Sequence, residues 1–343
     1  ALKRHWPDVE FAGLGGAKMR EFSGGRVRDW VEDAAVVGLW EVLKRYRWFK
    51  ARFEETKADV AAVDPDAVIL IDYPGFNLRL ARELRAAGTR AKLIDFISPQ
   101  VLAWHKERLL HMADYLDLML CIFPFEKELF EQAGLPTVWM GHPMVDQLEE
   151  KRIDGDREDG LVGLFPGSRE REVARLFPLI EESAKRLHAA HPAWIFEAAA
   201  ASGKLAGLMS QLVSAAGVPE GLVTIRTGTS QELMQRAAAG VVASGTATLE
   251  AAWYGLPYCL VYKVAWPTYL AARLMVELEF IGMVNILAGR QVVHEFVQGE
   301  ATTENVTSFL ESAMTDDVLR SELSSGLLET AALLGDGGAA RRA

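Results

Sequence analysis

Cysteine is scarce in this sequence, with two in 343 residues. Cys121 lies in the apolar run LMLCIF and Cys259 in PYCLVY, a setting typical of buried free thiols in a reducing compartment. No group of histidines and cysteines has the spacing of a zinc site. These features argue against a disulfide-stabilised scaffold and against a structural zinc domain.

Long apolar runs and an excess of positive charge are also lacking. No run approaches the ~18 residues of a membrane-spanning helix, and the net charge is −10. An acidic chain of this kind is not expected to bind nucleic acid, which requires a basic face. A G-x-G-x-x-G turn after a strand is absent as well, so a dinucleotide-dependent oxidoreductase is poorly supported.

What the sequence does contain is an alternation of short apolar runs and longer helical stretches. At roughly 100–200 residues per domain, its length suggests two domains. Continuous apolar strands predict burial on both faces, and the alternation predicts an α/β fold with doubly wound parallel sheets. Strands are predicted at 9–14, 67–71, 92–97, 117–122, 137–140, 161–165, 194–198, 222–226, 240–243 and 258–262, and helices at 78–87, 126–133, 170–189 and 203–215.

The polar, charged segment DQLEEKRIDGDREDG (146–160) is the best candidate for a linker, because a second series of strands and helices begins directly after it. We therefore predict two Rossmann-like domains, residues 1–148 and 149–343, that face each other across a cleft. The tail DGGAARRA (336–343) is expected to be frayed.

Ligands of open α/β sheets bind beyond the carboxyl ends of the strands, so the loops there are the first places to look for a site. Asp72 closes the strand AVILI (67–71) and precedes a turn at Pro74 and Gly75. A partly desolvated carboxylate at that position could accept a proton from an attacking hydroxyl group. The alternative is that Asp72 only caps the following turn.

The loop FPGSRERE (165–172) has the features of a diphosphate site. Gly167 lets the backbone approach a ligand closely, and the helix that follows offers free N–H groups at the positive end of its dipole. The guanidinium group of Arg169 can bind phosphate oxygens in a bidentate manner. The alternative is an ordinary turn with a solvated Arg169.

Two later loops also carry polar groups. In ASGTATLEAAWYGLP (243–257), a small turn rich in donors ends a strand, and Glu250 lies one turn into the next helix, where it could bind both hydroxyls of a ribose. The alternative is a glutamate on the helix surface. In NILAGR (285–290), Asn285 and Arg290 indicate by themselves only a loop with hydrogen-bonding capacity.

The segment VVGLWEVLKRYRWFKARF (36–53) is predicted to form an amphipathic helix. Aromatic and aliphatic residues opposite lysines and arginines, in an otherwise acidic chain, are typical of a helix at a membrane surface. The alternative is a helix packed on its own sheet with a solvated basic face. The residues assigned to a membrane- or acyl-facing surface are Leu39, Trp40, Leu43, Tyr46, Trp48 and Phe49.

In this order along the chain, these pieces resemble the lipid-A-disaccharide synthase family. The matching pieces are VVGLWEVL, IDYPGFN, ISPQVLAW, FPFEKELF, GHPMVD, FPGSRERE, ASGTATLEAA and NILAGR, and they span roughly residues 34–297. Each is modest alone, but together and in register they are specific. The resemblance implies a GT-B fold, with the nucleotide held mainly by the C-terminal domain and the acceptor by a membrane-facing N-terminal domain.

The activity implied by the resemblance is that of an inverting hexosyltransferase of lipid A and lipopolysaccharide biosynthesis. It would move 2,3-diacylglucosamine from UDP to 2,3-diacylglucosamine 1-phosphate, giving the β-1,6-linked disaccharide 1-phosphate and UDP. Asp72 would be the base on the acceptor 6-hydroxyl, and Arg169 would stabilise the departing UDP. The residues implied in UDP-sugar binding are Gly167, Ser168, Arg169, Glu172, Ser244, Gly245, Thr246, Glu250, Asn285 and Arg290.

No metal or cofactor is implied, because arginine and helix dipoles can neutralise the diphosphate. The implied partners are the lipid substrates and the inner-membrane surface, with no nucleic acid. The enzyme would be cytoplasmic and peripheral on the inner leaflet of a Gram-negative inner membrane. The C-terminal region of the family crosses back to the other domain or to a partner subunit, which leaves a homodimer open.

The sequence departs from the family pattern at two places. The family begins with an apolar strand and a Gly-Glu-x-Ser-Gly-Asp loop, whereas this sequence begins at Ala1 with residues that read as mid-helix. We therefore expect both features to lie upstream in a longer gene product. Gly75 stands where some members carry a second acidic residue that would support the base.

Two rival functions follow from the same features. An isomerase of the UDP-N-acetylglucosamine 2-epimerase type shares the two-domain architecture and the nucleotide loops but has no use for a lipid-facing helix. A non-catalytic, membrane-associated UDP-sugar binder would bind UDP without turnover. Activity on water-soluble UDP-N-acetylglucosamine would favour the first, and absence of turnover with the N-terminal loop restored would favour the second.

Overall fold

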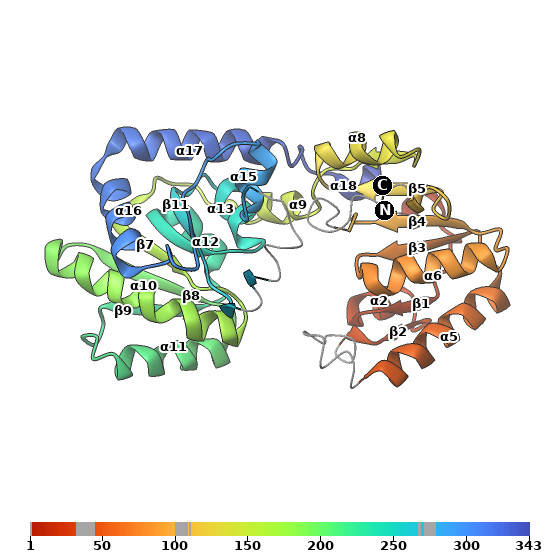
Figure 1. Cartoon of the computed structure of the whole chain (residues 1–343), viewed down its shortest axis with the longest axis horizontal. Coiled ribbons are helices and arrows are strands. Elements are labelled where there is room, and N and C mark those ends of the chain that lie inside the picture. The colour runs from red at the N-terminus through yellow and green to blue at the C-terminus, as the bar shows by residue number, and fades with distance from the viewer. Residues whose placement is uncertain (1, 32–44, 100–108, 110, 267–268, 271–278) are drawn as a thin grey trace.

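The computed structural model describes residues 2–31, 45–99, 109, 111–266, 269–270 and 279–343. Within these residues the strands form a four-stranded sheet, a six-stranded sheet and a short two-stranded pair, all of them parallel (Figure 1). Helices alternate with the strands along the chain. The predicted α/β class with parallel sheets is therefore confirmed.

The six-stranded sheet has the doubly wound order β12-β11-β10-β7-β8-β9. Its direction of winding reverses between the adjacent strands β7 and β10, and this reversal makes the crevice beyond their carboxyl ends the expected ligand site. The strands are β7 Glu158–Phe165, β8 Ile195–Ala200, β9 Val223–Thr227, β10 Ala237–Ala243, β11 Tyr258–Tyr262 and β12 Glu295–Val297.

Helices cover both faces of this sheet and bury its apolar strands, as predicted for β7, β10 and β11. One face packs against α10 Glu170–Ala190, α11 Gly203–Ala215 and α16 Thr303–Thr315. The other packs against α9 Met144–Glu149, α12 Ser230–Arg236, α13 Ala247–Trp253, α15 Met283–Ala288 and α17 Asp317–Ala332.

The four-stranded sheet has the order β3-β4-β5-β6, with β3 Ala67–Ile71, β4 Lys92–Phe96, β5 Leu118–Cys121 and β6 Thr137–Trp139. One face packs against α5 Tyr46–Val63, α6 Pro74–Ala86 and α8 Pro124–Gln132. On the other face lies α18 Ala339–Arg342, where Ala339 packs with Leu120 and Met140. Ile69 and Ile71 of β3 are 41% and 43% exposed, so the prediction of burial on both faces is wrong for this strand.

The N-terminal part contains α1 Leu2–His5, β1 Gly13–Gly15, α2 Ala17–Phe22 and β2 Val27–Asp29. The strand predicted at 9–14 is wrong for residues 9–12, since β1 begins at Gly13. Strands β2 and β12, of three residues each, were not predicted. The tail predicted to be frayed forms α18 instead.

The helix predicted at 36–53 is described from residue 46, where α5 begins, and it continues to Val63. Residues 36–44 lie outside the described residues, and with them Leu39, Trp40 and Leu43. No helix in the described part of the chain combines the length and the apolar character that crossing a bilayer requires.

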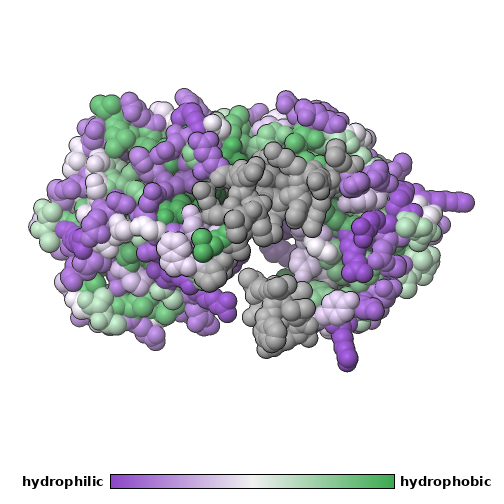
Figure 2. Space-filling view, in the orientation of Figure 1, coloured by the Kyte–Doolittle hydropathy of each residue, from purple (hydrophilic) through white to green (hydrophobic). Residues whose placement is uncertain are grey.

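The C-terminal segment, residues 334–343, returns to residues 140–146, and three hydrogen bonds join the two. The His142 N–H donates to the carbonyl of Leu334 at 2.8 Å, and the Gly338 N–H donates to Asp146 Oδ1 at 2.6 Å. Nε of Arg342 donates to the carbonyl of Met140 at 2.8 Å. Figure 2 shows the molecule as two masses with a hollow between them on the face viewed.

Candidate active site

The loops that follow β7 and β10 lie side by side at the reversal point of the six-stranded sheet. Gly167 has a φ of +108°, and a Cβ there would lie 2.8 Å from Glu172 Oε2 and 3.5 Å from Ala243 Cβ. Gly245 has a φ of +145°. Both turns therefore need glycine. The structure thus brings together, at Gly167 and Ala243, the two loops that the sequence singled out. These loops carry Ser168, Ser244 and Thr246, whose contact with a UDP-sugar stays a prediction.

Helix α10 begins in this crevice. Arg169 is its N-cap residue, and the Glu172 carboxylate accepts hydrogen bonds from the Arg169 backbone N–H at 3.3 Å and from its Nη1 at 3.1 Å. The Arg169 side chain is 69% exposed. An exposed pair of this kind contributes about 0–1 kcal/mol, so the guanidinium can turn to a diphosphate at little cost. The described role of Glu172 is to cap the helix, and its predicted contact with a UDP-sugar stays a prediction.

Tyr262, the last residue of β11, joins the same crevice although no sequence motif pointed to it. Burial raises the pKa of its hydroxyl group, and the charge of Glu172 raises it further. Its phenol therefore stays protonated at neutral pH and can donate a hydrogen bond. Its position at the carboxyl end of a predicted strand was the sequence feature that could have identified it as a site residue.

Glu250 lies in α13, the helix that follows the turn at 244–246. One oxygen of its carboxylate, Oε2, accepts a hydrogen bond from Gln231 Nε2 of α12 at 2.9 Å. Burial raises the pKa of the neighbouring Tyr254 to about 12, with a further contribution from the Glu250 charge. Glu250 is thus held by Gln231. The alternative interpretation, a glutamate on the helix surface, did not predict such a partner.

Arg157 joins the ends of α12 and α13. Its guanidinium donates to the carbonyls of Met234, Gln235 and Ala237 at the end of α12, and to that of Tyr254 at the end of α13. A cation at a helix C-terminus satisfies unpaired carbonyls and interacts favourably with the dipole.

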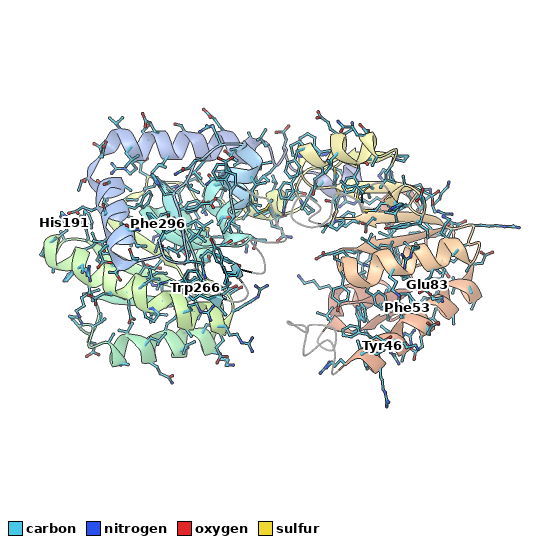
Figure 3. All side chains as sticks on the ribbon, viewed as in Figure 1. Tyr46, Phe53, Glu83, His191, Trp266 and Phe296 are labelled. Carbon is cyan, nitrogen blue, oxygen red and sulfur yellow. The ribbon has the colours of Figure 1, made fainter. Side chains whose placement is uncertain are left out.

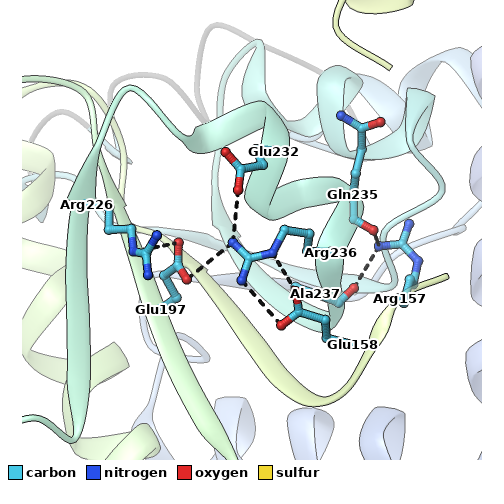
Figure 4. A network of polar contacts seen from close by, with 8 residues as sticks. All are labelled: Arg157, Glu158, Glu197, Arg226, Glu232, Gln235, Arg236 and Ala237. Atoms are coloured by element: carbon cyan, nitrogen blue, oxygen red, sulfur yellow. Dashed lines mark hydrogen bonds and ion pairs between the residues drawn. The ribbon is translucent and has the colours of Figure 1, made fainter. Parts of the chain in front are cut away.

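A second arginine, Arg236, is itself the last residue of α12. Arg236 pairs with Glu158, Glu197 and Glu232 (Figure 4). Helix α12 is therefore tied to β7 and β8 through its side chains as well as through its packing.

Asn285 and Arg290 have partners away from these loops. The buried amide of Asn285 donates to the Val293 carbonyl and to Glu295 Oε1, and its oxygen accepts from the N–H groups of Val292 and Val293. Arg290 is exposed and pairs with Glu329 of α17 at 3.3 Å. These contacts order the segment between α15 and β12, and donor binding by either residue stays a prediction.

The Asp72 loop follows β3 on the other sheet. Asp72 and Tyr73 have φ values of +48° and +50°, and Asn77 Nδ2 donates to the Asp72 carbonyl at 2.7 Å. The N-cap position of α6 belongs to Tyr73, and among the described contacts the Asp72 carboxylate accepts no hydrogen bond from the turn at Pro74 and Gly75 that it was alternatively expected to cap. The Asp72 side chain is exposed at the carboxyl end of the sheet, where a base must lie to reach a substrate.

Asp95 lies beneath this loop, in β4. It is 2% exposed, and its register neighbours are Leu70 of β3 and Met119 of β5. Burial raises the pKa of its carboxyl group to about 8, with a smaller contribution from the charge of Asp72. The catalytic candidate therefore has a buried, protonated neighbour at neutral pH.

An aromatic cluster joins α5 to the Asp72 loop and consists of Trp30, Trp48, Phe49, Tyr73 and Phe76. Trp30 stacks on Trp48 at 6.0 Å between ring centroids and meets Tyr73 edge-on at 5.9 Å. Phe49 lies 6.3 Å from Tyr73. The contacts of Trp48 and Phe49 within the fold agree with the alternative of a packed helix for these two residues.

Tyr46, by contrast, is 54% exposed at the start of α5, while Phe53 is buried against α6 (Figure 3). Lys57 Nζ and Glu83 Oε2, 2.7 Å apart, tie the two helices together. The membrane- or acyl-facing role of the described residues in this helix stays a prediction.

Comparison with known proteins gives both the family and the fold. The model of the family described as Lipid-A-disaccharide synthetase matches residues 1–323. The chain is 36% identical to the lipid-A-disaccharide synthase of Geobacter sulfurreducens, over 98% of this chain and 88% of the relative. It is 37% identical to that of Trichlorobacter lovleyi over the same shares.

Solved structures resemble the chain in fold. A putative UDP-N-acetylglucosamine 2-epimerase from Listeria monocytogenes has a TM-score of 0.58 at 11% identity, over 97% of this chain and 94% of the other. A UDP-forming trehalose-phosphate synthase from Burkholderia xenovorans has a TM-score of 0.51 at 12% identity, over 88% and 77%.

Identity this low carries the fold alone, so the resemblance to an epimerase does not favour isomerase activity. The predicted GT-B fold with two Rossmann-like units is confirmed. The sequence match, by contrast, covers nearly the whole chain and includes the loops at the reversal point and after β3. The chain belongs to the lipid-A-disaccharide synthetase family.

Proposed function

We infer that this chain transfers 2,3-diacylglucosamine from UDP to 2,3-diacylglucosamine 1-phosphate, forming the disaccharide 1-phosphate of lipid A and releasing UDP. The observation that carries this inference is the match to lipid-A-disaccharide synthases over nearly the whole chain. The crevice between the β7 and β10 loops adds physical support, since a glycine turn and a helix N-terminus there offer backbone N–H groups suited to a diphosphate.

We propose that the second half of the chain holds UDP. The N-terminus of α10 presents free backbone N–H groups to the diphosphate, next to the glycine turn at Gly167. The guanidinium of Arg169 neutralises charge on the leaving phosphate as the glycosidic bond breaks. Glu250 accepts hydrogen bonds from the ribose hydroxyls through the carboxylate oxygen that Gln231 leaves unoccupied.

We propose that Asp72 is the general base. The 6-hydroxyl oxygen of the acceptor attacks the anomeric carbon of the donor as the bond to the diphosphate breaks, and UDP departs with the bonding electrons. The hydroxyl proton passes to the Asp72 carboxylate. Attack from the face opposite UDP inverts the anomeric configuration and gives the β linkage.

We also propose that the enzyme works as a peripheral protein on the inner leaflet of a Gram-negative inner membrane. Both substrates carry acyl chains, and the start of α5 presents the exposed Tyr46, Arg47 and Lys50 near the Asp72 loop. Aromatic and basic side chains together suit an anionic lipid surface.

Substitution of Asp72 by asparagine tests the reaction and the base together. Asparagine tolerates the positive φ of this position, so the backbone is expected to stay unchanged. UDP release with both acylated substrates in mixed micelles should fall about 10²-fold or more, with KM nearly constant. Asp66→Asn, a carboxylate change one residue before β3, is the matched control and should retain full activity.

Two results would overturn this proposal. Wild-type activity on UDP-N-acetylglucosamine without any acylated acceptor would favour the isomerase. Undiminished activity of Asp72→Asn would mean that another group takes the proton.

A further inference from the structure

Helix α12 carries a glutamine that touches the proposed ribose ligand, and no motif of the sequence singled it out. Gln231 Nε2 donates to Glu250 Oε2 at 2.9 Å, and its Oε1 accepts from Lys151 Nζ at 2.7 Å. Gln231 thus bridges a cation from the segment before β7 to a carboxylate in α13. The three side chains are joined in a row by hydrogen bonds, and we call this row the Lys151–Gln231–Glu250 relay.

The chemistry of the two outer groups fixes the orientation of the amide. An ammonium group can only donate, so it must face the amide oxygen, and an ionised carboxylate can only accept, so it must face the NH₂ group. A flipped amide would set donor against donor and acceptor against acceptor. Lys151 therefore dictates that Gln231 presents a donor to Glu250.

The backbone at both ends of the relay is held in place. Gln235, one turn along α12, donates to the Lys151 carbonyl at 3.0 Å and accepts from the Ile153 N–H at 2.8 Å. Arg157 joins the C-terminal ends of α12 and α13, which carry Gln231 and Glu250. The glutamine is therefore placed by fixed elements and is not a mobile surface side chain.

We propose that Gln231, oriented by Lys151, is a positioning residue that holds the Glu250 carboxylate in the rotamer needed to bind the ribose of a uridine nucleotide. The inference rests on the proposed function, in which Glu250 binds ribose. With Oε2 engaged by Gln231, Oε1 faces the nucleotide. Without the glutamine the carboxylate must be ordered at the moment of binding, at an entropic cost to affinity.

Calorimetric titration of the full chain with UDP and with 2′-deoxy-UDP tests this role directly. One hydrogen bond to a charged group is worth about 1.5 kcal/mol, so the wild type should prefer UDP about tenfold. In Gln231→Ala the preference should fall below about threefold through weaker UDP binding, with a smaller loss of affinity for 2′-deoxy-UDP, which keeps only the 3′-hydroxyl for Glu250. Lys151→Met, which removes only the orienting donor, should lose part of the preference.

The controls separate this inference from the site assignment. Gln211→Ala makes the same chemical change at an exposed position of α11 and should keep the full preference. If Glu250→Gln abolishes the preference while Gln231→Ala keeps it, Glu250 binds ribose without help and the positioning role is wrong. If Glu250→Gln keeps the preference, Glu250 is not the ribose ligand and both assignments fail. Equal weakening of both nucleotides by Gln231→Ala would indicate a general loss of structure and would also overturn the proposal.

Discussion

Among the described residues, Asp95 is a buried carboxyl group without an opposite charge beside it. It lies between Leu70 and Met119 with 2% of its surface exposed, and among the described residues no hydrogen bond reaches its carboxyl group. Its nearest recorded charge is Asp72, which is of the same sign. Both burial and this neighbour favour the protonated form.

We expect the stability of the protein to fall as pH rises from about 4 to about 8 because of Asp95. Between its unfolded pKa near 4 and its folded pKa of about 8, the native state keeps a proton that the unfolded chain releases, so the free energy of unfolding decreases with pH. The full effect is on the order of 5 kcal/mol. In Asp95→Asn this contribution disappears, and the thermal midpoint should fall less steeply over the same range.

Asp114→Asn supplies the control for that melting series, because Asp114 is exposed. Its midpoint should follow the wild-type curve. Parallel curves for the wild type and Asp95→Asn would mean that the Asp95 carboxyl group is already ionised at neutral pH, and the description of a protonated neighbour beneath the base would be wrong.

At the scale of helices and strands, the sequence predicted those elements whose residues carry their own signal. The runs at β3 and β11 are apolar throughout and were predicted with their observed bounds. β12 was not, because it has three residues and its place is set by pairing with β11. A strand that is apolar throughout can be predicted from its own residues, whereas a short edge strand forms because it pairs with a neighbouring strand of the sheet.

The residues of the candidate site divide in the same way, into those with a local sequence signal and those whose role depends on tertiary packing. Arg169 and Glu250 were predicted because the ends of parallel strands mark the ligand crevice. Gln231 was missed because its role depends on how α12 packs against α13 and on Lys151, 80 residues away in the chain. For Asn285 the family resemblance implied a contact with the donor, and the sequence by itself indicated only a loop. Asn285 instead lies in α15, and its amide is saturated by contacts with residues 292–295.

Helix α5 carries the prediction on membrane binding. The chain should co-sediment with vesicles that contain phosphatidylglycerol, and less so as salt rises. Each basic side chain near an anionic surface contributes about 1 kcal/mol, so Arg47→Glu with Lys50→Glu should weaken binding at least about tenfold. Arg186→Glu with Lys204→Glu makes the same charge change on α10 and α11. Equal losses in the two double variants would assign the effect to net charge and would contradict a role for α5.

On the scale of the whole molecule, the proposed base and the proposed nucleotide site belong to different sheets. Asp72 follows β3, whereas Arg169 and Glu250 follow β7 and β10. Transfer between them requires a fixed relative position, since a misplacement of about 1 Å can lower a rate about 10²-fold. The returning C-terminal segment supplies part of that placement through Gly338, Ala339 and Arg342, which contact Asp146, Leu120 and Met140.

Deletion of residues 336–343 is therefore expected to separate nucleotide binding from transfer. All strands of the six-stranded sheet precede the deletion, and its helices keep their packing, so UDP affinity measured by calorimetry should stay within about twofold of the wild type. The transfer rate should fall at least about tenfold, because the first sheet loses the contacts of α18 and Asp72 is no longer held at a fixed distance from the donor. Arg341→Ala, at an exposed position of α18, should leave both quantities unchanged. Retained transfer by the deletion variant would mean that the remaining connections, namely the segment before β7 and the contact of His142 with Leu334, suffice to align the two sheets. A parallel loss of UDP binding would mean that α18 stabilises the fold as a whole and has no separate part in alignment.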